Sequence, residues 1–507
     1  MESSLKKYRA GLTVSFCKAK LQSQDNFSGI PAACLSLVFQ FINTTPRSPK
    51  HALRNTKHAP RSPKHALRNT HSETRNTLPE TRNTHPETRT PKHAPRSPKP
   101  VYLRRMDLVI IGGGAAGFFA AITAAEAAPG ARVCILERGQ SVLQKVKVSG
   151  GGRCNVTHAC PDARELVRHY PRGSRELLAP FLRFGTADTV QWFEQRGVRL
   201  KTEADGRMFP LSDESQTIVD CLWNAAKRAG VNVRTSARVE GIEPLGQRWR
   251  IRLGRTEQLQ ADRVLVATGS SEAIWTILAG LGHRIVAPVP SLFTFNTKDP
   301  RLRDLAGLSM PDATVSVAGS RLSARGPVLI THWGLSGPAI LRLSAWGARE
   351  FQALGYTFAI RINWLGERTE PDILAALNRF KTDIGRKQVA AHAQWNIPQR
   401  LWERLVAAAG LAPETRWADL GKPALQKLAT ELGASTFSIN GKSTFKEEFV
   451  TAGGVDLREV QFKTFESKLH PGLFFAGEVL DVDAITGGFN FQAAWTGGWI
   501  AGKAMSV

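Results

Sequence analysis

Residues 106–155 read MDLVIIGGGAAGFFAAITAAEAAPGARVCILERGQSVLQKVKVSGGGRCN, and this stretch decides the fold. Its first part, Leu108–Ile111, is a short apolar run rich in β-branched residues, which is typical of a buried parallel strand. Good helix-forming residues follow over Phe118–Ala128 and stop at a Pro-Gly pair. Ala131–Leu136 is a second apolar strand. The order of strand, turn, helix and strand predicts the opening unit of a doubly wound α/β fold.

The turn before the helix carries three spaced glycines, Gly112, Gly114 and Gly117. The first can take the tight turn, the second lets a pyrophosphate approach the backbone, and the third lets the helix pack closely on the strand. The helix N-terminus adds free N–H groups and partial positive charge. Glu137 follows Gly117 by twenty residues, at the end of the second strand, where a carboxylate can accept both hydroxyls of a ribose. Together these features predict a dinucleotide site that disfavours a 2′-phosphate, and therefore NADP.

Residues 1–105 differ from the rest of the chain. The segment PRSPKHALRNT at 46–56 recurs unchanged at 60–70, and few large apolar side chains occur in 45–100, so this tract cannot bury a core. It carries 20 Lys and Arg against 5 Asp and Glu, and so holds +15 of the formal net charge of +25. We interpret 1–105 as a low-complexity basic tail, either disordered or a spurious upstream start that precedes a true start at Met106. A basic arm that binds nucleic acid or an anionic surface is the alternative.

The remaining 402 residues, 106–507, are too many for one simple core and predict two or three domains. Their cysteines are Cys134, Cys154, Cys160 and Cys221, without a disulfide framework or zinc-ligand pairs, which is typical of a reducing compartment. The run 108–128 is long and nearly uncharged, but its glycines favour strand, turn and helix over a membrane span. We therefore expect a soluble, cytoplasmic protein with no metal site.

A second glycine-rich stretch, KVKVSGGGRCN, occupies 145–155. Three consecutive glycines between Ser149 and Arg153 can wrap backbone N–H groups around an anion or a flat ring. Lys147 and Arg153 can supply positive charge beside a flavin that becomes anionic on reduction, which makes both candidate catalytic residues. The alternative is an ordinary basic loop.

The glycine motifs GGGAAG at 112–117 and SGGGRCN at 149–155 resemble those of the NAD(P)/FAD-dependent oxidoreductases of the aminoacetone-oxidase type. Three later stretches agree, namely GRMFP at 206–210, THWGLSGP at 331–338 and the glycine-rich segment 472–498. The resemblance covers essentially all of 106–507 and none of 1–105. It implies non-covalent FAD and a Rossmann-like FAD-binding domain of the two-dinucleotide-binding type, interrupted by a β-barrel-like domain and a small helical domain. It implies no particular substrate, because the substrates of the family are diverse.

Cys154 and Cys160 partly resemble the redox-active cysteine pair of flavin disulfide reductases. Those pairs have four residues between the cysteines, whereas five intervene here. We therefore interpret Cys154 as a small group packed near the flavin, with a dithiol role as the alternative.

The chain returns to the cofactor at two later places. The strand 264–266 leads into Ala267–Gly269, a glycine turn beneath the cofactor. Relatives follow this turn with an aromatic–proline segment, but 270–272 reads SSE, which leaves the contacts there open. Near the C-terminus, the strand 473–476 followed by Gly477 and Glu478 resembles a second FAD fingerprint. Gly487 and Gly488 then open a final helix, 492–505, whose N-terminus can stabilise negative charge on the flavin.

These motifs together define the candidate site. The expected cofactor-binding residues are Gly112, Gly114, Ala115, Ala116, Gly117, Glu137, Arg138, Ser149, Gly150, Gly151, Gly152, Arg153, Cys154, Asn155, Val239, Ala267, Thr268, Gly269, Gly477, Glu478, Asp481, Gly487, Gly488, Phe489 and Asn490. The candidate catalytic residues are Arg153, Lys147 and His332, the last because it lies in the THWGLSGP motif.

The same patterns predict the domain boundaries. Residues 106–288 and 451–507 form the FAD-binding domain, 289–365 and 433–450 a β-rich insert, and 366–432 a helical domain. Amphipathic spacing predicts helices over 181–196 and 215–229.

The leading functional interpretation is an FAD-dependent oxidoreductase that transfers a hydride or electron pair to or from a small molecule. Because no second G-x-G-x-x-G occurs, NAD(P)H as donor would have to dock transiently at the flavin. A flavoprotein that acts on tRNA or other RNA is the alternative; the net charge of +10 on 106–507 permits it, but no basic surface studded with aromatic residues is evident. A non-catalytic flavin-binding sensor is the third interpretation.

Overall fold

A computed structural model describes residues 105–443 and 450–507. The predicted basic tail lies outside these residues except for Arg105. Among the described residues, no helix combines the length and the apolar character that a membrane crossing requires.

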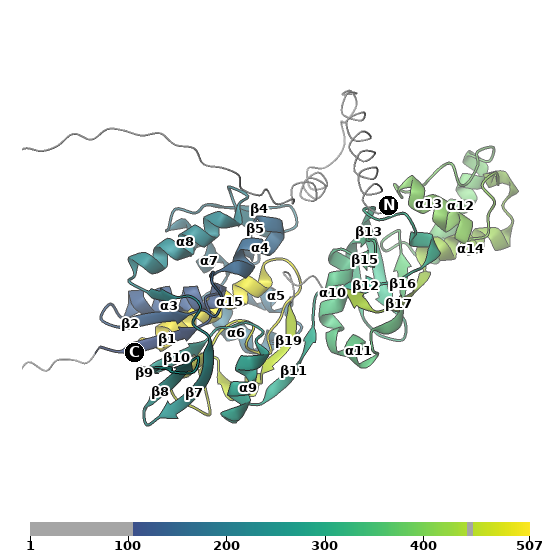
Figure 1. Ribbon diagram of the computed structural model, residues 1–507. Helices are drawn as coiled ribbons and strands as arrows, with labels where there is room; N and C mark the ends of the chain where they lie inside the picture. The colour runs from purple at the N-terminus through teal and green to yellow at the C-terminus, as the bar shows by residue number, and fades with distance from the viewer. Residues whose placement is uncertain (1–104, 444–449) are drawn as a thin grey trace, which may run out of the picture. The chain divides into compact units, whose positions relative to one another are not determined.

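A seven-stranded sheet forms the centre of the predicted FAD-binding domain (Figure 1). Its strands are, in spatial order, β20 (Val460–Gln461), β21 (Glu466–Ser467), β22 (Leu473–Phe475), β10 (Arg263–Val266), β1 (Asp107–Ile111), β2 (Arg132–Leu136) and β6 (Asn232–Arg234). The strands from β22 to β6 are parallel, as the apolar runs predict. Ile111 pairs with both Leu136 and Val266, so β1, β2 and β10 end at the same edge of the sheet. The segments that follow these strands therefore meet at that edge.

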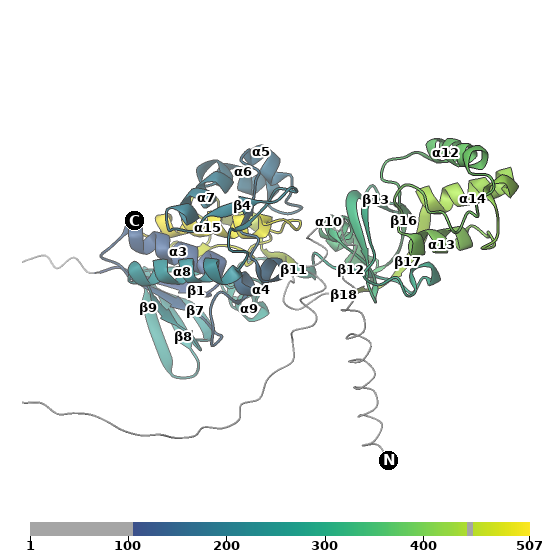
Figure 2. The same ribbon diagram turned by 90° about the horizontal axis from the view of Figure 1, so that it is seen from above.

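Two helices pack tightly on each other beside this sheet, as both views show (Figures 1 and 2). They are α3 (Ala115–Ala127), which follows the first glycine turn, and α15 (Phe489–Ala504), which ends the fold. Glycines permit the close approach, because a Cβ at Gly498 would lie 2.6 Å from the Ala116 carbonyl oxygen and one at Gly502 would lie 2.5 Å from that of Ala120. The C-terminal helix thus completes the domain that the first strand begins.

The remaining elements of this domain surround the sheet. Its other helices are α4 (Gln144–Gly152), α5 (Ala163–Val167), α6 (Ser174–Arg183), α7 (Thr186–Glu194), α8 (Ser215–Arg228) and α9 (Glu272–Gly280). Two small antiparallel sheets have the strand orders β3 (Thr157–His158), β5 (Arg207–Pro210), β4 (Leu200–Thr202) and β7 (Val239–Leu245), β8 (Arg248–Leu253), β9 (Glu257–Ala261).

One predicted helix is in fact divided between two helices. The span 181–196 contains the end of α6 and the whole of α7, which are separated at Phe184 and Gly185. Gly185 is the N-cap of α7, and its N–H donates to the Asp188 carboxylate at 2.7 Å, so the local capping contact starts a new helix. The helix predicted over 215–229 is confirmed as α8.

The insert is built on a second, antiparallel seven-stranded sheet. Its strands are, in spatial order, β17 (Ser435–Asn440), β16 (Thr357–Asn363), β13 (Ser309–Val317), β14 (Ser323–Ile330), β15 (Gly334–Ser336), β12 (Thr294–Asn296) and β18 (Lys442–Ser443). The helical elements of this part are η1 (Pro300–Leu302), α10 (Pro338–Trp346), α11 (Ala348–Ala353), α12 (Glu370–Asp383), α13 (Gln399–Ala408), η2 (Trp417–Asp419) and α14 (Lys422–Gly433). The buried apolar residues of the sheet and of α12, α13 and α14 form one continuous core. A separate core fills the FAD-binding domain.

Two antiparallel strands, β11 (Ile285–Pro290) and β19 (Thr451–Val455), carry the chain between these parts, and η3 (Leu457–Glu459) follows the second. A buried ion pair lies at the same junction. The Arg172 guanidinium binds both oxygens of the Asp483 carboxylate and donates to the Ala345 carbonyl of α10 at 2.7 Å. Ser291 donates to the same carboxylate at 2.7 Å. We call Arg172, Asp483, Ser291 and Ala345 the Arg172 cluster; it joins four segments that are far apart in the sequence.

Candidate functional site

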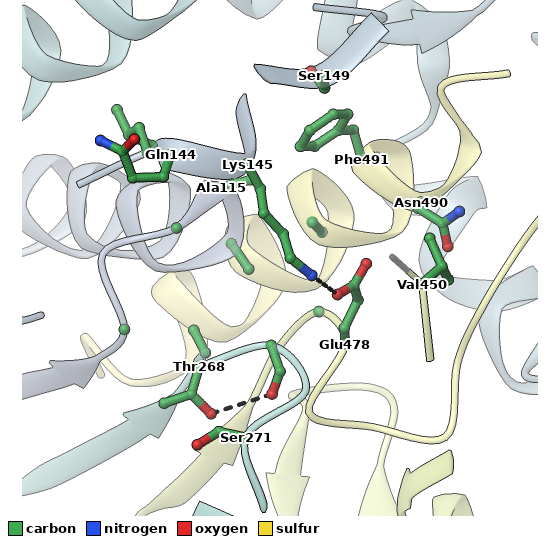
Figure 3. A pocket seen from close by; sticks show the side chains of 18 of the residues that line it. Ala115, Gln144, Lys145, Ser149, Thr268, Ser271, Val450, Glu478, Asn490 and Phe491 are labelled. Carbon is green, nitrogen blue, oxygen red and sulfur yellow. Dashed lines mark hydrogen bonds and ion pairs between the residues drawn. The ribbon is translucent and has the colours of Figure 1, made fainter. Parts of the chain in front are cut away.

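A cavity of about 820 Å³ lies at the carboxyl ends of the parallel strands (Figure 3). The lining combines the turns after β1, β2, β10 and β22 with the N-terminal part of α15 and one wall from the insert. This edge of an open α/β sheet is where such folds bind their ligands.

The three spaced glycines occupy the positions that their pattern requires. Gly112 has φ +111°, and a Cβ there would lie 2.4 Å from the Ala267 carbonyl oxygen. A Cβ on Gly117 would lie 2.0 Å from the carbonyl oxygen of Gly112, so no side chain fits between helix and turn. Gly114 is the N-cap of α3, and among the described residues no atom outside its own chain neighbourhood lies within 4 Å of its Cβ position. A ligand can therefore reach the backbone at Gly114 while the other two glycines hold the turn in shape.

Glu137 lies at the end of β2 and lines the cavity. One carboxylate oxygen accepts the N–H of Gly113 at 2.8 Å, and the other accepts the N–H of Gly139 at 2.7 Å. The side chain thus ties the first glycine turn to the turn after β2. Each carboxylate oxygen can accept a further hydrogen bond, which leaves capacity for hydroxyl donors from a ligand.

The second glycine stretch interrupts α4 rather than extending it. Gly150 and Gly151 take left-handed backbone angles, φ +58° and +68°. Ser149, Gly150 and Asn155 line the cavity. When the Asn155 amide is oriented to satisfy both neighbours, it accepts from the Gly488 N–H and donates to the Thr157 carbonyl, each at 3.0 Å. Asn155 therefore connects this stretch with the second fingerprint.

The residues of the second FAD fingerprint also line the cavity. Gly477, Glu478, Gly487 and Gly488 line the cavity, and α15 begins directly after Gly488. Figure 3 shows Lys145 of α4 and Glu478 reaching toward each other, and their charged atoms lie 2.7 Å apart. This ion pair joins the two glycine-rich regions inside the cavity.

The short segment after Gly269 also contributes to the site. Ser271, Ala273 and Ile274 line the cavity at the start of α9. The segment after Gly269, whose cofactor contacts the sequence did not predict, therefore borders the same cavity through the N-terminus of α9.

Most of the residues expected to bind a cofactor converge on this cavity. Those that line it are Gly112, Gly114, Ala115, Ala116, Glu137, Arg138, Ser149, Gly150, Asn155, Val239, Ala267, Thr268, Gly269, Gly477, Glu478, Gly487, Gly488 and Asn490. The described lining does not include Gly117, Gly151, Gly152, Arg153, Cys154, Asp481 or Phe489. Asp481 instead pairs with Arg349 of α11 at 3.0 Å.

The three candidate catalytic residues lie outside the described lining of the cavity. Arg153 pairs with Glu203 at 2.6 Å, and its guanidinium lies 3.9 Å from the centre of the Phe209 ring. Lys147 and His332 are exposed. The catalytic role of these three residues therefore stays a prediction.

Several lining residues were not anticipated. Lys145 lines the cavity whereas Lys147 does not, because residues two apart on a helix do not share a face. Phe491 lines the cavity because it lies within the first turn of α15, whose N-terminus faces the cavity. The insert wall comprises Leu292, Phe293, Thr294, Ser336, Leu341, Ser443 and Val450. These residues come from separated segments, and the sequence gives no local signal that brings them together.

The Cys154 thiol is poorly suited to redox chemistry. It is fully buried, and this burial raises the pKa of Cys154 to about 12, so the reactive thiolate does not form near neutral pH. The pKa of the Cys160 thiol is also raised, chiefly by burial.

We therefore expect Cys154→Ala to retain bound flavin and to turn over at the wild-type rate. Flavin absorbance per chain measures the first property, and steady-state turnover measures the second. Cys160→Ala is the matched variant, because a dithiol mechanism needs both sulfurs. Loss of turnover in each single variant, with flavin still bound, would establish the dithiol role.

Comparison with known proteins places the chain in a family. Residues 106–504 match the family described as HI0933-like protein Rossmann domain. The chain is 30% identical over 414 residues to 3-dehydro-bile acid delta(4,6)-reductase of Clostridium scindens, a match that covers 78% of this chain and 98% of the relative. It is also 30% identical over 410 residues to ribosomal RNA dihydrouridine synthase of Escherichia coli, covering 78% and 97%, and 27% identical over 412 residues to that of Haemophilus influenzae, covering 78% and 98%.

These matches confirm the Rossmann-like FAD-binding fold and the oxidoreductase class that the motifs predict. Because the family match extends over nearly all of the described residues, the protein belongs to the HI0933-like family of Rossmann-fold flavoproteins and is an FAD-dependent oxidoreductase.

Proposed function

We propose that the protein is a reductase that uses non-covalent FAD to add a hydride to a carbon–carbon double bond conjugated with a carbonyl group. The substrate is a small molecule, and NAD(P)H is the electron donor. The observation that carries this proposal is the composition of the cavity, in which fingerprint residues meet an insert wall made of neutral hydroxyl and apolar side chains.

The residues around the cavity fit FAD. The open backbone at Gly114 and the N-terminus of α3 would hold the pyrophosphate. Glu137 would accept the ribose hydroxyls of the adenosine half, through the lone pairs that its two backbone bonds leave available. Gly477, Glu478 and the N-terminus of α15 would hold the ribityl chain and the flavin ring. Bound FAD supplies the two-electron chemistry, while these residues supply binding and orientation.

The insert wall suits a neutral carbonyl compound. Thr294, Ser336 and Ser443 present hydroxyl groups, and Leu292, Leu341 and Val450 are among the apolar residues beside them. None of the residues of this described wall is charged, so a neutral ligand can bind there without burying an unpaired ion.

The names of the relatives support the same reaction type. One name denotes reduction at the delta(4,6) positions of a 3-dehydro bile acid, and the other denotes saturation of uridine to dihydrouridine. Both reactions saturate a carbon–carbon double bond that is conjugated with a carbonyl group. A shared reaction type with different substrates is consistent with a common FAD-binding domain and a variable insert wall.

The test uses the full-length flavoprotein under anaerobic conditions. NADH or NADPH should bleach the flavin absorbance near neutral pH. The reduced enzyme should then be re-oxidised by testosterone or 2-cyclohexen-1-one, and much more slowly by cyclohexene, which lacks the carbonyl. Equal rates with the ketone and with cyclohexene, or no re-oxidation by any conjugated carbonyl compound, would contradict the proposal.

A second candidate function is reduction of uridine within RNA. Two relatives are ribosomal RNA dihydrouridine synthases, and Trp333, at the turn between β14 and β15, is 55% exposed beside the exposed His332. Exposed aromatic rings can stack on unpaired bases. Dihydrouridine formation in an rRNA fragment by the reduced enzyme, together with RNA binding that weakens steeply with salt, would favour this function over the first.

A further inference from the structure

We propose that Thr294, Ser336 and Ser443 form a substrate subsite in which the Thr294–Ser336 pair donates to the carbonyl oxygen and Ser443 offers an acceptor beside it. This inference rests on the proposed reduction of a conjugated double bond, and it assigns the residues that would recognise the conjugated carbonyl. We call these three side chains the hydroxyl row.

The register of the insert sheet places the hydroxyl row on one face. Thr294 of β12 pairs directly with Ser443 of β18. On the other side of β12, the pairing of Phe295 with Leu335 of β15 sets Thr294 beside Ser336, and the two hydroxyl oxygens lie 3.1 Å apart. Side chains at opposed positions of antiparallel strands lie on the same face of a sheet. All three also line the cavity, so the row belongs to its wall.

The hydrogen bonds within the row leave a donor available. A hydroxyl has one hydrogen to donate and two lone pairs to accept with. Thr294 donates its hydrogen to the Ser336 hydroxyl oxygen at 3.1 Å, and within the described chain the Ser336 hydroxyl has no acceptor for its own hydrogen. Ser443 donates its hydrogen to the Asn296 side-chain oxygen at 2.9 Å. The row can therefore donate one hydrogen bond from the Thr294–Ser336 pair and accept one at Ser443.

A hydrogen-bond donor in the hydroxyl row would stabilise the negative charge that the reaction places on the carbonyl oxygen. When a hydride adds to the β-carbon, the carbon–carbon π pair shifts to form a double bond between the α-carbon and the carbonyl carbon, and the carbonyl π pair moves onto the oxygen. A proton from water then bonds to the α-carbon and restores the carbonyl. The hydride derives from NAD(P)H by way of the flavin, so one nicotinamide is oxidised for each double bond that is reduced. A hydroxyl that donates to the oxygen stabilises the charge as it develops.

The hydrogen-bond acceptor at Ser443 would favour a substrate that has an N–H group beside its carbonyl. A 3-oxo steroid has no hydrogen to donate beside its carbonyl, whereas uracil has an N–H next to the C4 carbonyl. Loss of the Ser443 hydroxyl should therefore weaken the reaction of a uridine substrate more than that of a steroid enone.

The experiment compares Thr294→Val, Ser336→Ala and the double variant with the wild type. Thr294→Ser restores the hydroxyl and serves as the rescue variant. Thr314→Val is the matched control, because Thr314 lies on β13 of the same sheet outside the described cavity lining, and its buried hydroxyl has no partner among the described residues. Flavin content and melting temperature establish that each variant is folded.

Two readouts are measured on each protein. The first is re-oxidation of the reduced flavin by testosterone, which should slow by about 10- to 100-fold in the double variant, since loss of an oxyanion donor has effects of this order or larger. Reduction of the flavin by NADH should stay unchanged. The second is binding of 4-chlorophenol to the oxidised enzyme, followed by a long-wavelength absorbance band. The phenol oxygen stands in for the carbonyl oxygen, so the dissociation constant should rise about tenfold.

The two readouts separate failure of the subsite from failure of the proposed function. If the wild type reduces no conjugated carbonyl compound but the double variant still weakens phenol binding, the function fails and the subsite stands. If the wild type reduces testosterone and the folded double variant does so equally fast, the subsite is overturned. An unchanged phenol affinity, or no phenol binding by the wild type, also counts against it.

Discussion

Replacement of Glu137 by alanine should lower the affinity for FAD by roughly two to four powers of ten. The substitution removes the acceptor for two ribose hydroxyls, each a charge-assisted bond of about 1.5–3 kcal/mol. It also frees the N–H groups of Gly113 and Gly139, which the carboxylate now holds at 2.8 and 2.7 Å, so the glycine turn loses its anchor. Titration of the apoprotein with FAD, followed by flavin fluorescence, measures the loss.

Two variants sharpen this test. Glu137→Gln keeps one acceptor oxygen but directs an NH2 group at the second backbone N–H, so its effect should lie between those of the wild type and the alanine variant. Glu126→Ala is the matched control, because Glu126 is an exposed residue of α3 that pairs with Arg196 away from the cavity. A folded Glu137→Ala protein that purifies with a full complement of FAD would show that Glu137 has no part in cofactor binding.

Replacement of Asp483 by alanine should destabilise the protein by about 3–5 kcal/mol. The Asp483 side chain is fully buried and that of Arg172 is 13% exposed, so the variant would leave a largely buried guanidinium without the carboxylate that binds it. Ser291 would also lose its acceptor. Chemical denaturation monitored by tryptophan fluorescence measures the loss.

A double variant tests whether the loss of stability comes from the unpaired guanidinium. Arg172→Met combined with Asp483→Leu removes both charges, and it should therefore be more stable than Asp483→Ala alone. Asp220→Ala provides the control, because Asp220 is an exposed residue of α8, where a change within about 0.5 kcal/mol is expected. An equal loss in the Asp483 and Asp220 variants would mean that the buried pair contributes little.

The part of the site that could be predicted is the part built from local sequence. The glycine turn and Glu137 lie within one strand–helix–strand unit, where spacing alone fixes which residues face the ligand. Lys147, which was selected for its charge, lies outside the described lining whereas Lys145 lines the cavity, because residues two apart on α4 do not share a face. Arg153 has the right charge, but Glu203 and Asp213 hold it outside the described lining.

The hydroxyl row could not be predicted, because it depends on strand register. Thr294, Ser336 and Ser443 are ordinary strand residues whose meeting requires β15, β12 and β18 to pair in one particular alignment. A slip of one residue would turn each hydroxyl to the opposite face. The position of the Arg172 cluster depends in the same way on long-range packing.

The division of the FAD-binding domain between the two ends of the described chain has a consequence for its biosynthesis. Domains fold as the chain emerges, with N-terminal parts first. The strands β1, β2 and β10 emerge early, but β22, the second fingerprint and α15 emerge last. The insert and the helical segment share their own core and can fold in the interval. Until the ribosome releases the final helix, α3 lacks its closest packing partner and the cavity lacks the wall around Gly477 and Gly488. A chain arrested before α15 would therefore lack part of the cavity lining and would expose to chaperones the face of α3 that α15 covers.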